Sequence, residues 1–199
     1  MKKRAFRDWS YWGRPVPGFG DPEALLVCVG LAPAAHGGNR TGRIFTGDRS
    51  GEWLYGALHR HGFASQAESV SKDDGMLLTG AYVTAAGRCA PPGNRPTPVE
   101  LARCRPYLAE ELAALGRARV VMALGGIAWD SVLAVWREQG HAMPRPRPRF
   151  GHGAMARISA DVPILLGSYH PSQLNTQTGT LTRAMFDAVF QSAKALIEE

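Results

Sequence analysis

The sequence predicts an α/β fold with three layers, α/β/α, around a central, mostly parallel, four-stranded sheet. Short apolar runs of strand length alternate along the chain with segments whose apolar residues recur at helical spacing. The chain has 199 residues, of which 45% are hydrophobic and 20% charged, which suits a globular protein with one buried core. Because no repeat and no linker composition interrupts it, we expect residues 1–199 to form a single domain.

The expected strands are near-continuous apolar runs without polar alternation, which is typical of strands buried on both faces of a sheet. They lie at residues 25–30, 77–84, 119–125 and 164–169. Helical segments separate them, so right-handed crossovers that place the strands in parallel are expected.

Helices are expected at residues 51–61, 97–115, 127–139 and 181–197. The second of these has the clearest start, because Thr97 is a suitable N-cap, Pro98 fits the first turn and Glu100 can reach back to the cap. The last begins at an apolar position and continues nearly to the end of the chain.

Two further segments are rich in proline. Residues 1–20 contain Trp, Tyr and Pro and predict an ordered, extended arm. Residues 143–149 alternate Pro with Arg, which makes a stiff, extended, basic loop. This loop has two interpretations that we weigh equally: a contact with a phosphate backbone, or a solvated connector.

The charge and the cysteine content limit the classes of protein. The net charge is +6, and most of the basic residues are arginines. This is compatible with a nucleic-acid partner, although genome composition also produces such a bias. No apolar run is long enough to cross a membrane, and the basic N-terminus lacks the apolar stretch of a secretory signal, so we expect a cytoplasmic protein. Three cysteines are too few for a disulfide scaffold, and Cys28 lies within an apolar strand pattern.

Chemistry-bearing residues follow the first and the last expected strands. Because ligands in parallel α/β sheets bind where strands end, these two exits are expected to share one pocket. Asp48 is the sole carboxylate of the two exits; it is also a good helix N-cap, and this role does not exclude a catalytic one. Phe45 lies among Arg, Thr and Gly residues, which favours a loop and a functional role over a ring in the core. His170 precedes a proline, and its alternative is a purely structural role.

Four ordered motifs give the chain a specific resemblance to the family 5 (type b) uracil-DNA glycosylases over nearly its whole length. They are GLAPAAHG at 30–37, NRTGRIFTGD at 39–48, RCAPPGNRP at 88–96, and HPS at 170–172 with NTQTG at 175–179. The resemblance implies the uracil-DNA-glycosylase fold and a monomeric, monofunctional enzyme of base-excision repair. Such an enzyme hydrolyses the N-glycosidic bond of uracil in DNA.

The resemblance also implies roles in a base pocket. Phe45 would stack on a flipped base, His170 would donate a hydrogen bond to the departing base, and Asp48 would position the water. Ala32 stands where better-known glycosylases carry a water-activating Asp. In this chain the attacking water would therefore be positioned by Asp48 or held by the main chain. Ala34 stands where uracil-strict enzymes carry a bulky Tyr, so tolerance of other deaminated bases, such as hypoxanthine, is expected.

The remaining site residues are assigned by the same comparison. Gly30 and Asn94 would line the base pocket, although Gly-Asn is also ordinary turn chemistry and the turn is favoured for Asn94. Leu174 would wedge into the vacated base-pair space and Ser172 would bind a flanking phosphate. The expected DNA contacts are Arg40, Ser172, Leu174 and Asn175.

The cysteines Cys89 and Cys104 fit the second half of the family's four-cysteine pattern for a [4Fe–4S] cluster. In the family the other two ligands come from an upstream segment that this sequence does not contain. Either the sequence is shortened at its start, or this member has lost the cluster. A structural zinc site would also need more ligands than these two cysteines supply.

Two rival functions remain. A nucleotide-binding transferase on a similar sheet is disfavoured, because the sequence has no complete phosphate-binding loop or dinucleotide fingerprint. A non-catalytic DNA-damage-binding module on the same fold is the main alternative, since Ala32 and the missing cysteines both depart from the family. No lysine belongs to a motif, so a hydrolytic mechanism is expected and not an imine intermediate.

Overall fold

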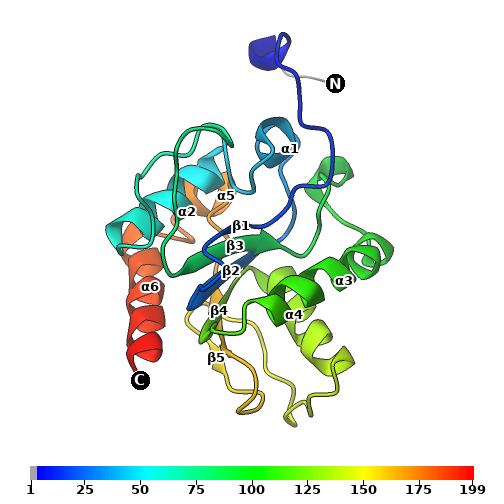
Figure 1. Ribbon diagram of the computed structural model, residues 1–199, viewed down its shortest axis with the longest axis vertical. Helices are drawn as coiled ribbons and strands as arrows, with labels where there is room; N and C mark the ends of the chain where they lie inside the picture. Colours follow the sequence, from blue (N-terminus) through cyan, green and yellow to red (C-terminus); the bar gives the residue numbers. More distant parts are fainter. Residues whose placement is uncertain (1–3) are drawn as a thin grey trace.

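The computed structural model describes residues 4–199 and contains one six-stranded sheet in the order β1-β3-β2-β4-β6-β5 (Figure 1). The four inner strands are parallel, whereas the two-residue strands at either edge are antiparallel to their neighbours. The strands are β1 (Phe19–Gly20), β2 (Leu26–Gly30), β3 (Ala81–Ala85), β4 (Val120–Leu124), β5 (Met155–Ala156) and β6 (Ile164–Ser168).

The predicted fold class is confirmed, with two corrections to the sheet. The two edge strands were not predicted, because two residues are too few to form a recognisable pattern. The strand expected at 77–84 begins only at Ala81. Gly80 has φ +67°, which breaks the extended backbone, so Leu78 forms an isolated bridge with Ala64 and Leu77 is exposed.

The four predicted helices are present within a few residues of their expected bounds, and four short helical segments accompany them. The expected capping box starts α3, where Glu100 N donates to Thr97 Oγ1 at 3.2 Å and Thr97 N donates to Glu100 Oε2 at 2.7 Å. The helical segments are η1 (Arg4–Phe6), α1 (Gly38–Thr41), α2 (Arg49–Arg60), η2 (Pro92–Asn94), α3 (Pro98–Ala114), α4 (Gly126–Glu138), α5 (Gln173–Gln177) and α6 (Arg183–Glu198).

Helices cover both faces of the sheet, which explains why its inner strands are apolar throughout. Along β2, Leu26 and Cys28 pack in the core formed with α2 and α6, whereas Val27 and Val29 pack in the core formed with α3 and α4 (Figure 1). Burial raises the pKa of the Cys28 thiol to about 12, so this cysteine is a small buried hydrophobe.

Residues 4–18 run in an irregular path past α1 before they join the sheet as β1 (Figure 1). Backbone hydrogen bonds hold this segment, from Trp12 N to Arg40 O at 3.1 Å and from Val16 N to Arg88 O at 2.8 Å. Within the described part of the chain, no helix is long and apolar enough to span a membrane.

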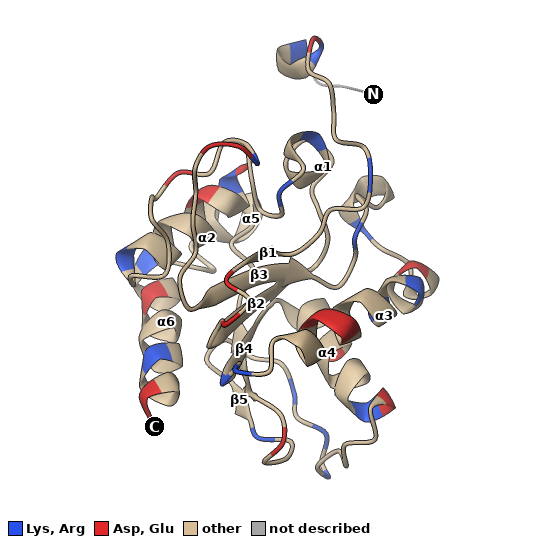
Figure 2. Ribbon diagram, in the orientation of Figure 1, with Lys and Arg blue, Asp and Glu red and all other residues tan. Residues whose placement is uncertain are grey.

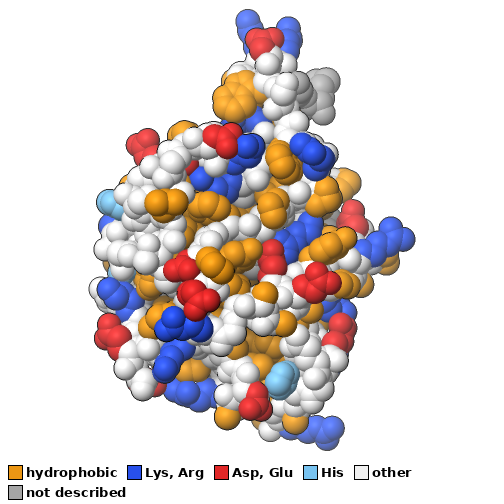
Figure 3. All heavy atoms as spheres, viewed as in Figure 1, with side chains coloured by type: hydrophobic (Ala, Val, Ile, Leu, Met, Phe, Trp, Pro, Cys, Tyr) orange, Lys and Arg blue, Asp and Glu red, His pale blue; other side chains and the backbone are white. Residues whose placement is uncertain are grey.

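The loop at 143–149 packs along α4, toward the opposite end of the molecule from α1 and α5 (Figures 1 and 2). Trp129 Nε1 donates to Pro148 O at 3.2 Å, and Arg147 pairs with Asp130 at 2.7 Å. These contacts favour the connector interpretation. Basic and acidic side chains are interspersed over the face seen in Figure 3, so the net charge forms no continuous basic stripe there.

Candidate active site

Phe45 lies across the end of β2 in a strained backbone conformation. Its φ is +53°, which is unusual for any residue other than glycine, and its side chain is only 7% exposed. Two glycines allow this placement. A Cβ on Gly30 would lie 2.5 Å from the Phe45 ring, and a Cβ on Gly51 would lie 1.7 Å from the Phe45 carbonyl oxygen.

A buried ion pair holds the loop that carries Phe45. Arg43 pairs with Asp74 at 2.5 Å, and its guanidinium also donates to Ser69 Oγ at 2.7 Å and Thr46 Oγ1 at 3.0 Å. Burial alone would raise the pKa of Asp74, but the Arg43 guanidinium and backbone N–H donors outweigh it and lower the pKa to about 2. Sequence reasoning missed this network, because its members lie in two loops separated by α2 and give no periodic signal.

His170 follows β6 and meets Phe45, so the two strand exits share one site as predicted. The ring centroids are 5.7 Å apart and the planes are inclined by 30°. Asn175 Nδ2 donates to the His170 carbonyl oxygen at 2.9 Å, which fixes the backbone at this point. Burial lowers the pKa of His170 to about 4, so the imidazole is neutral near pH 7 and carries one N–H donor.

Asp48 is the N-cap of α2, where its Oδ1 accepts a hydrogen bond from Gly51 N at 3.0 Å. Its Oδ2 lies against the loop after β2, because a Cβ on Gly37 would lie only 2.0 Å from that oxygen. Burial raises the pKa of Asp48, and the N–H groups of Gly51 and Ser50 counteract this. The capping alternative is therefore correct, and it leaves one carboxylate oxygen beside the strand exit.

The small residues of the first exit loop lie at the same edge of the sheet. Ala32 is half-buried and packs close to Gly87, on which a Cβ would lie 3.1 Å from that of Ala32. Ala34 is also half-buried. Asn94 is exposed in η2 with φ +56°, which agrees with the turn interpretation; no contact of the described residues joins it to Phe45 or His170.

The expected DNA contacts on the second exit surround α5. Ser172 is the N-cap of this helix and accepts a hydrogen bond from Asn175 N at 3.2 Å. Leu174 is 70% exposed, which suits a wedge. The Asn175 side chain donates to the His170 carbonyl oxygen, so it stabilises the backbone of the site.

The placement of Arg40 differs from the expected contact with DNA. Its side chain is buried, its Nε donates to His36 O at 2.8 Å, and its Nη2 donates to Gly47 O at 3.1 Å. The guanidinium also lies 4.1 Å from the Phe6 ring centroid and 4.2 Å from that of Trp9. The sequence alone does not show that the N–H donors of an arginine in a loop are already bound to carbonyl oxygens of that loop.

A half-buried histidine that sequence reasoning left without a role supports the β6 exit. His152 Nδ1 accepts from Tyr169 N at 3.1 Å, so its Nε2 carries the proton and donates to Met185 O at 3.2 Å. This histidine thus links β6 to α6 immediately before His170. Its position between two glycines is the only sequence signal, and that signal is weak.

Cys89 and Cys104 lie close together but form only part of a metal site. Arg88 N donates to Cys104 Sγ at 3.5 Å, and the pKa of Cys89 is raised by burial and by the neighbouring Cys104. Among the described residues, no group of three or more His, Cys, Asp or Glu side chains could hold a metal ion. These two thiols alone do not fit a four-thiolate cluster.

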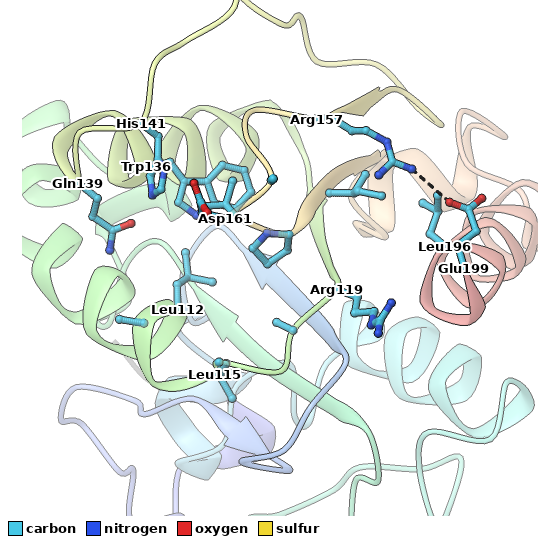
Figure 4. A pocket seen from close by; sticks show the side chains of 17 residues that line it. Leu112, Leu115, Arg119, Trp136, Gln139, His141, Arg157, Asp161, Leu196 and Glu199 are labelled. Atoms are coloured by element: carbon cyan, nitrogen blue, oxygen red, sulfur yellow. Dashed lines mark hydrogen bonds and ion pairs between the residues drawn. The ribbon is translucent and has the colours of Figure 1, made fainter.

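One cavity lies elsewhere, at the edge of the sheet where β4 and β6 begin. It has a volume of about 740 Å³, and the ion pair between Arg157 and Glu199 lies at its side (Figure 4). It contains none of the motif residues. Ligands of parallel sheets bind at the opposite edge, where the strands end, so the Phe45–His170 edge is the candidate active site.

Comparisons of the sequence with known proteins agree on one superfamily. The sequence profile of the Uracil DNA glycosylase superfamily matches residues 17–194. A type-5 uracil-DNA glycosylase of Mycobacterium tuberculosis (strain CDC 1551 / Oshkosh) is 51% identical over 197 residues, covering 98% of this chain and 72% of the relative. The corresponding protein of Thermus thermophilus is 52% identical over 195 residues (98% and 86%), and that of Pyrobaculum aerophilum is 46% identical over 192 residues (96% and 80%).

Proposed function

The chain belongs to the uracil DNA glycosylase superfamily, and we propose that it hydrolyses the bond between uracil and deoxyribose in DNA, in base-excision repair. The observation that carries this proposal is the stacked pair of Phe45 and His170 beside Asp48, in a chain about half identical to type-5 uracil-DNA glycosylases. The site has the parts that the reaction needs, namely a stacking surface, a neutral donor and a carboxylate.

The base must leave the helical stack before it can enter this site, at a cost of a few kcal/mol. Phe45 then offers an aromatic face for the flipped uracil. Gly30, which has no side chain, leaves room for the Phe45 ring at the end of β2. The loop is held by buried hydrogen bonds before the base arrives, so little ordering is required on binding.

The departing uracil takes the electron pair of the C1′–N1 bond and becomes an anion. His170 is neutral near pH 7, so its N–H dipole, and not a full positive charge, donates to the base carbonyl as negative charge develops. A buried donor of this kind is held in place by packing and needs no reorganisation during the reaction.

Asp48 complements the other half of the transition state. Its carboxylate faces the sugar, which carries oxocarbenium-like positive charge, and orients a water whose oxygen forms the new bond to C1′. The water's proton passes to Asp48 Oδ2 or to solvent. Because Ala32 offers no carboxylate, we assign this role to Asp48.

The substrate range follows from the size of Ala34. A methyl group at this half-buried position leaves more space in the loop after β2 than a tyrosine would. We therefore propose that hypoxanthine and other deaminated bases are also released. Measurement of base release from matched duplexes, each with one such lesion, tests this extension.

The cysteine pair supports a separate proposal, that Cys89 and Cys104 are two ligands of an iron–sulfur cluster. The mutual closeness of the two thiols and the family resemblance support it. Cys28 cannot join them, because it is enclosed in β2. Visible absorbance and bound iron in the purified protein test the proposal, and colourless, iron-free protein with full activity would oppose it.

We propose that the protein acts as a monomer in the cytoplasm. Mass measurement by light scattering tests the oligomeric state. The decisive experiment on function incubates the protein with a duplex that carries one uracil and looks for an alkali-labile abasic site. A duplex with thymine at that position is the control. Tight binding to the uracil duplex without base release would instead support a damage-binding module.

A further inference from the structure

Arg49 is an exposed cation next to the proposed catalytic carboxylate. It is the first residue of α2 and directly follows Asp48, so the two Cα atoms are about 3.8 Å apart. Its Nε donates to Thr176 Oγ1 at 3.5 Å, the outer limit of a hydrogen bond. In the part of the chain that the structure describes, no carboxylate forms an ion pair with Arg49.

This hydrogen bond joins the two elements that border the site. Asp48 caps the start of α2, and α5 carries Thr176 together with the exposed Leu174. The two helices lie side by side (Figure 1). Arg49 therefore lies at the rim between the proposed water-positioning carboxylate and the proposed wedge.

The neighbouring arginines of the first exit loop are already engaged. Arg40 donates to two loop carbonyls and Arg43 pairs with Asp74, and both are buried. In contrast, Nη1 and Nη2 of Arg49 have no partner among the described residues, and they form the fork that binds a phosphate in bidentate fashion. Of these three arginines, Arg49 is thus the one whose guanidinium remains available to a ligand.

We infer that Arg49 binds a backbone phosphate of the flipped nucleotide or of its immediate neighbour. This inference rests on the proposed function. A nucleotide whose base lies against Phe45 and whose sugar lies near Asp48 must pass its phosphates over the rim, where Arg49 is the next residue. Arg49 also offsets the repulsion between that phosphate and the Asp48 carboxylate.

The salt dependence of binding tests this assignment, because each phosphate neutralised in duplex DNA adds about 0.9 to the magnitude of the slope of log K against log salt. The probe is a duplex with one 2′-fluoro-2′-deoxyuridine, whose fluorine opposes oxocarbenium formation and prevents release. Binding is measured by fluorescence anisotropy from 50 to 200 mM KCl. The variants are Arg49→Gln, Arg49→Lys and, as control, Arg137→Gln, which removes an exposed arginine from the far end of α4.

We expect Arg49→Gln to lower the slope by about 0.9, so that the unsubstituted protein loses about 3.5-fold more affinity than this variant across the salt range. Arg49→Lys should keep most of the slope, and Arg137→Gln should keep all of it. An unchanged slope in Arg49→Gln, or an equal change in Arg137→Gln, overturns the inference. Uracil release by the unsubstituted protein is scored separately, so failure of the proposed function is distinguishable.

Discussion

The ring of Phe45 stacks on the imidazole of His170 with their centroids 5.7 Å apart, although one residue follows the first central strand along the chain and the other follows the last. Strands β2 and β6 both pair with β4, so their ends lie at the same edge of the sheet with one strand between them. The parallel topology thus brings the two halves of the site together.

The contact between Phe45 and Gly30 gives the first prediction. In Gly30→Ala, the added Cβ would lie 2.5 Å from the Phe45 ring, so the ring must move and the stacking surface is lost. We expect uracil release under single-turnover conditions to fall by about 10- to 100-fold, because small misplacements cost that much. Gly116→Ala is the control, since a Cβ there meets nothing within 4 Å. Equal rates for the two variants would contradict the prediction.

The buried ion pair between Arg43 and Asp74 predicts a loss of stability in acid. The pKa of Asp74 is about 2 in the folded protein and near the model-peptide value of 3.8 in the unfolded chain. A lowered carboxyl pKa stabilises the fold above the unfolded value, and that stability, roughly 2 kcal/mol, is lost as the pH falls from about 4 to about 2. Urea unfolding of the unsubstituted protein and of Asp74→Asn over this range measures it. The substituted protein should lack this part of the pH dependence.

Burial of His170 predicts the pH profile of base release. Its pKa of about 4 keeps the imidazole neutral from pH 5 to 8, so the rate should show no inflection near pH 6.5. We expect His170→Ala to lower the rate about 100-fold across that range, as for loss of one oxyanion donor. An inflection near pH 6.5 that disappears in His170→Ala would show that the imidazole titrates in the free enzyme.

The exposed Leu174 allows a matched test of the wedge. Leu174 is 70% exposed in α5, and Leu77 is 69% exposed in a loop that the site does not use. We expect Leu174→Ala to weaken base flipping about 10-fold, seen as reduced fluorescence of 2-aminopurine placed beside the lesion, whereas Leu77→Ala should not change it. A similar loss in both variants would indicate a general effect of surface hydrophobicity.

The sequence predicted those parts of the molecule that have a periodic or capped signature. Apolar runs located the four inner strands, and the capping box at Thr97 and Glu100 located the start of α3. The two edge strands have only two residues each, so they leave no pattern. The meeting of Phe45 and His170 was predictable from parallel topology alone.

Side-chain partners were predictable only where both groups lie within a few residues of each other in the sequence. The Asp48 cap on Gly51 is local in sequence, whereas Arg43 and Asp74 lie in separate loops on either side of α2, and no sequence pattern connects them. Arg40 was assigned to DNA because its charge was visible and its burial was not. Burial depends on packing between distant segments, which is why it is the property that the sequence predicts least well.

The double role of Asp48 determines which substitution can test it. Asp48→Ala removes the N-cap of α2 as well as the charge, and loss of a cap costs about 1 kcal/mol, so lost activity would have two causes. Asn caps helices as well as Asp does, so Asp48→Asn keeps the hydrogen bond from Gly51 N and removes only the negative charge. We therefore expect Asp48→Asn to melt within a few degrees of the unsubstituted protein and to release uracil about 100- to 10,000-fold more slowly. Thermal unfolding and single-turnover rates of the same preparation measure both quantities. Full activity in a stably folded Asp48→Asn would show that Asp48 serves only as the N-cap of α2. The attacking water would then be positioned by the main chain of the loop after β2.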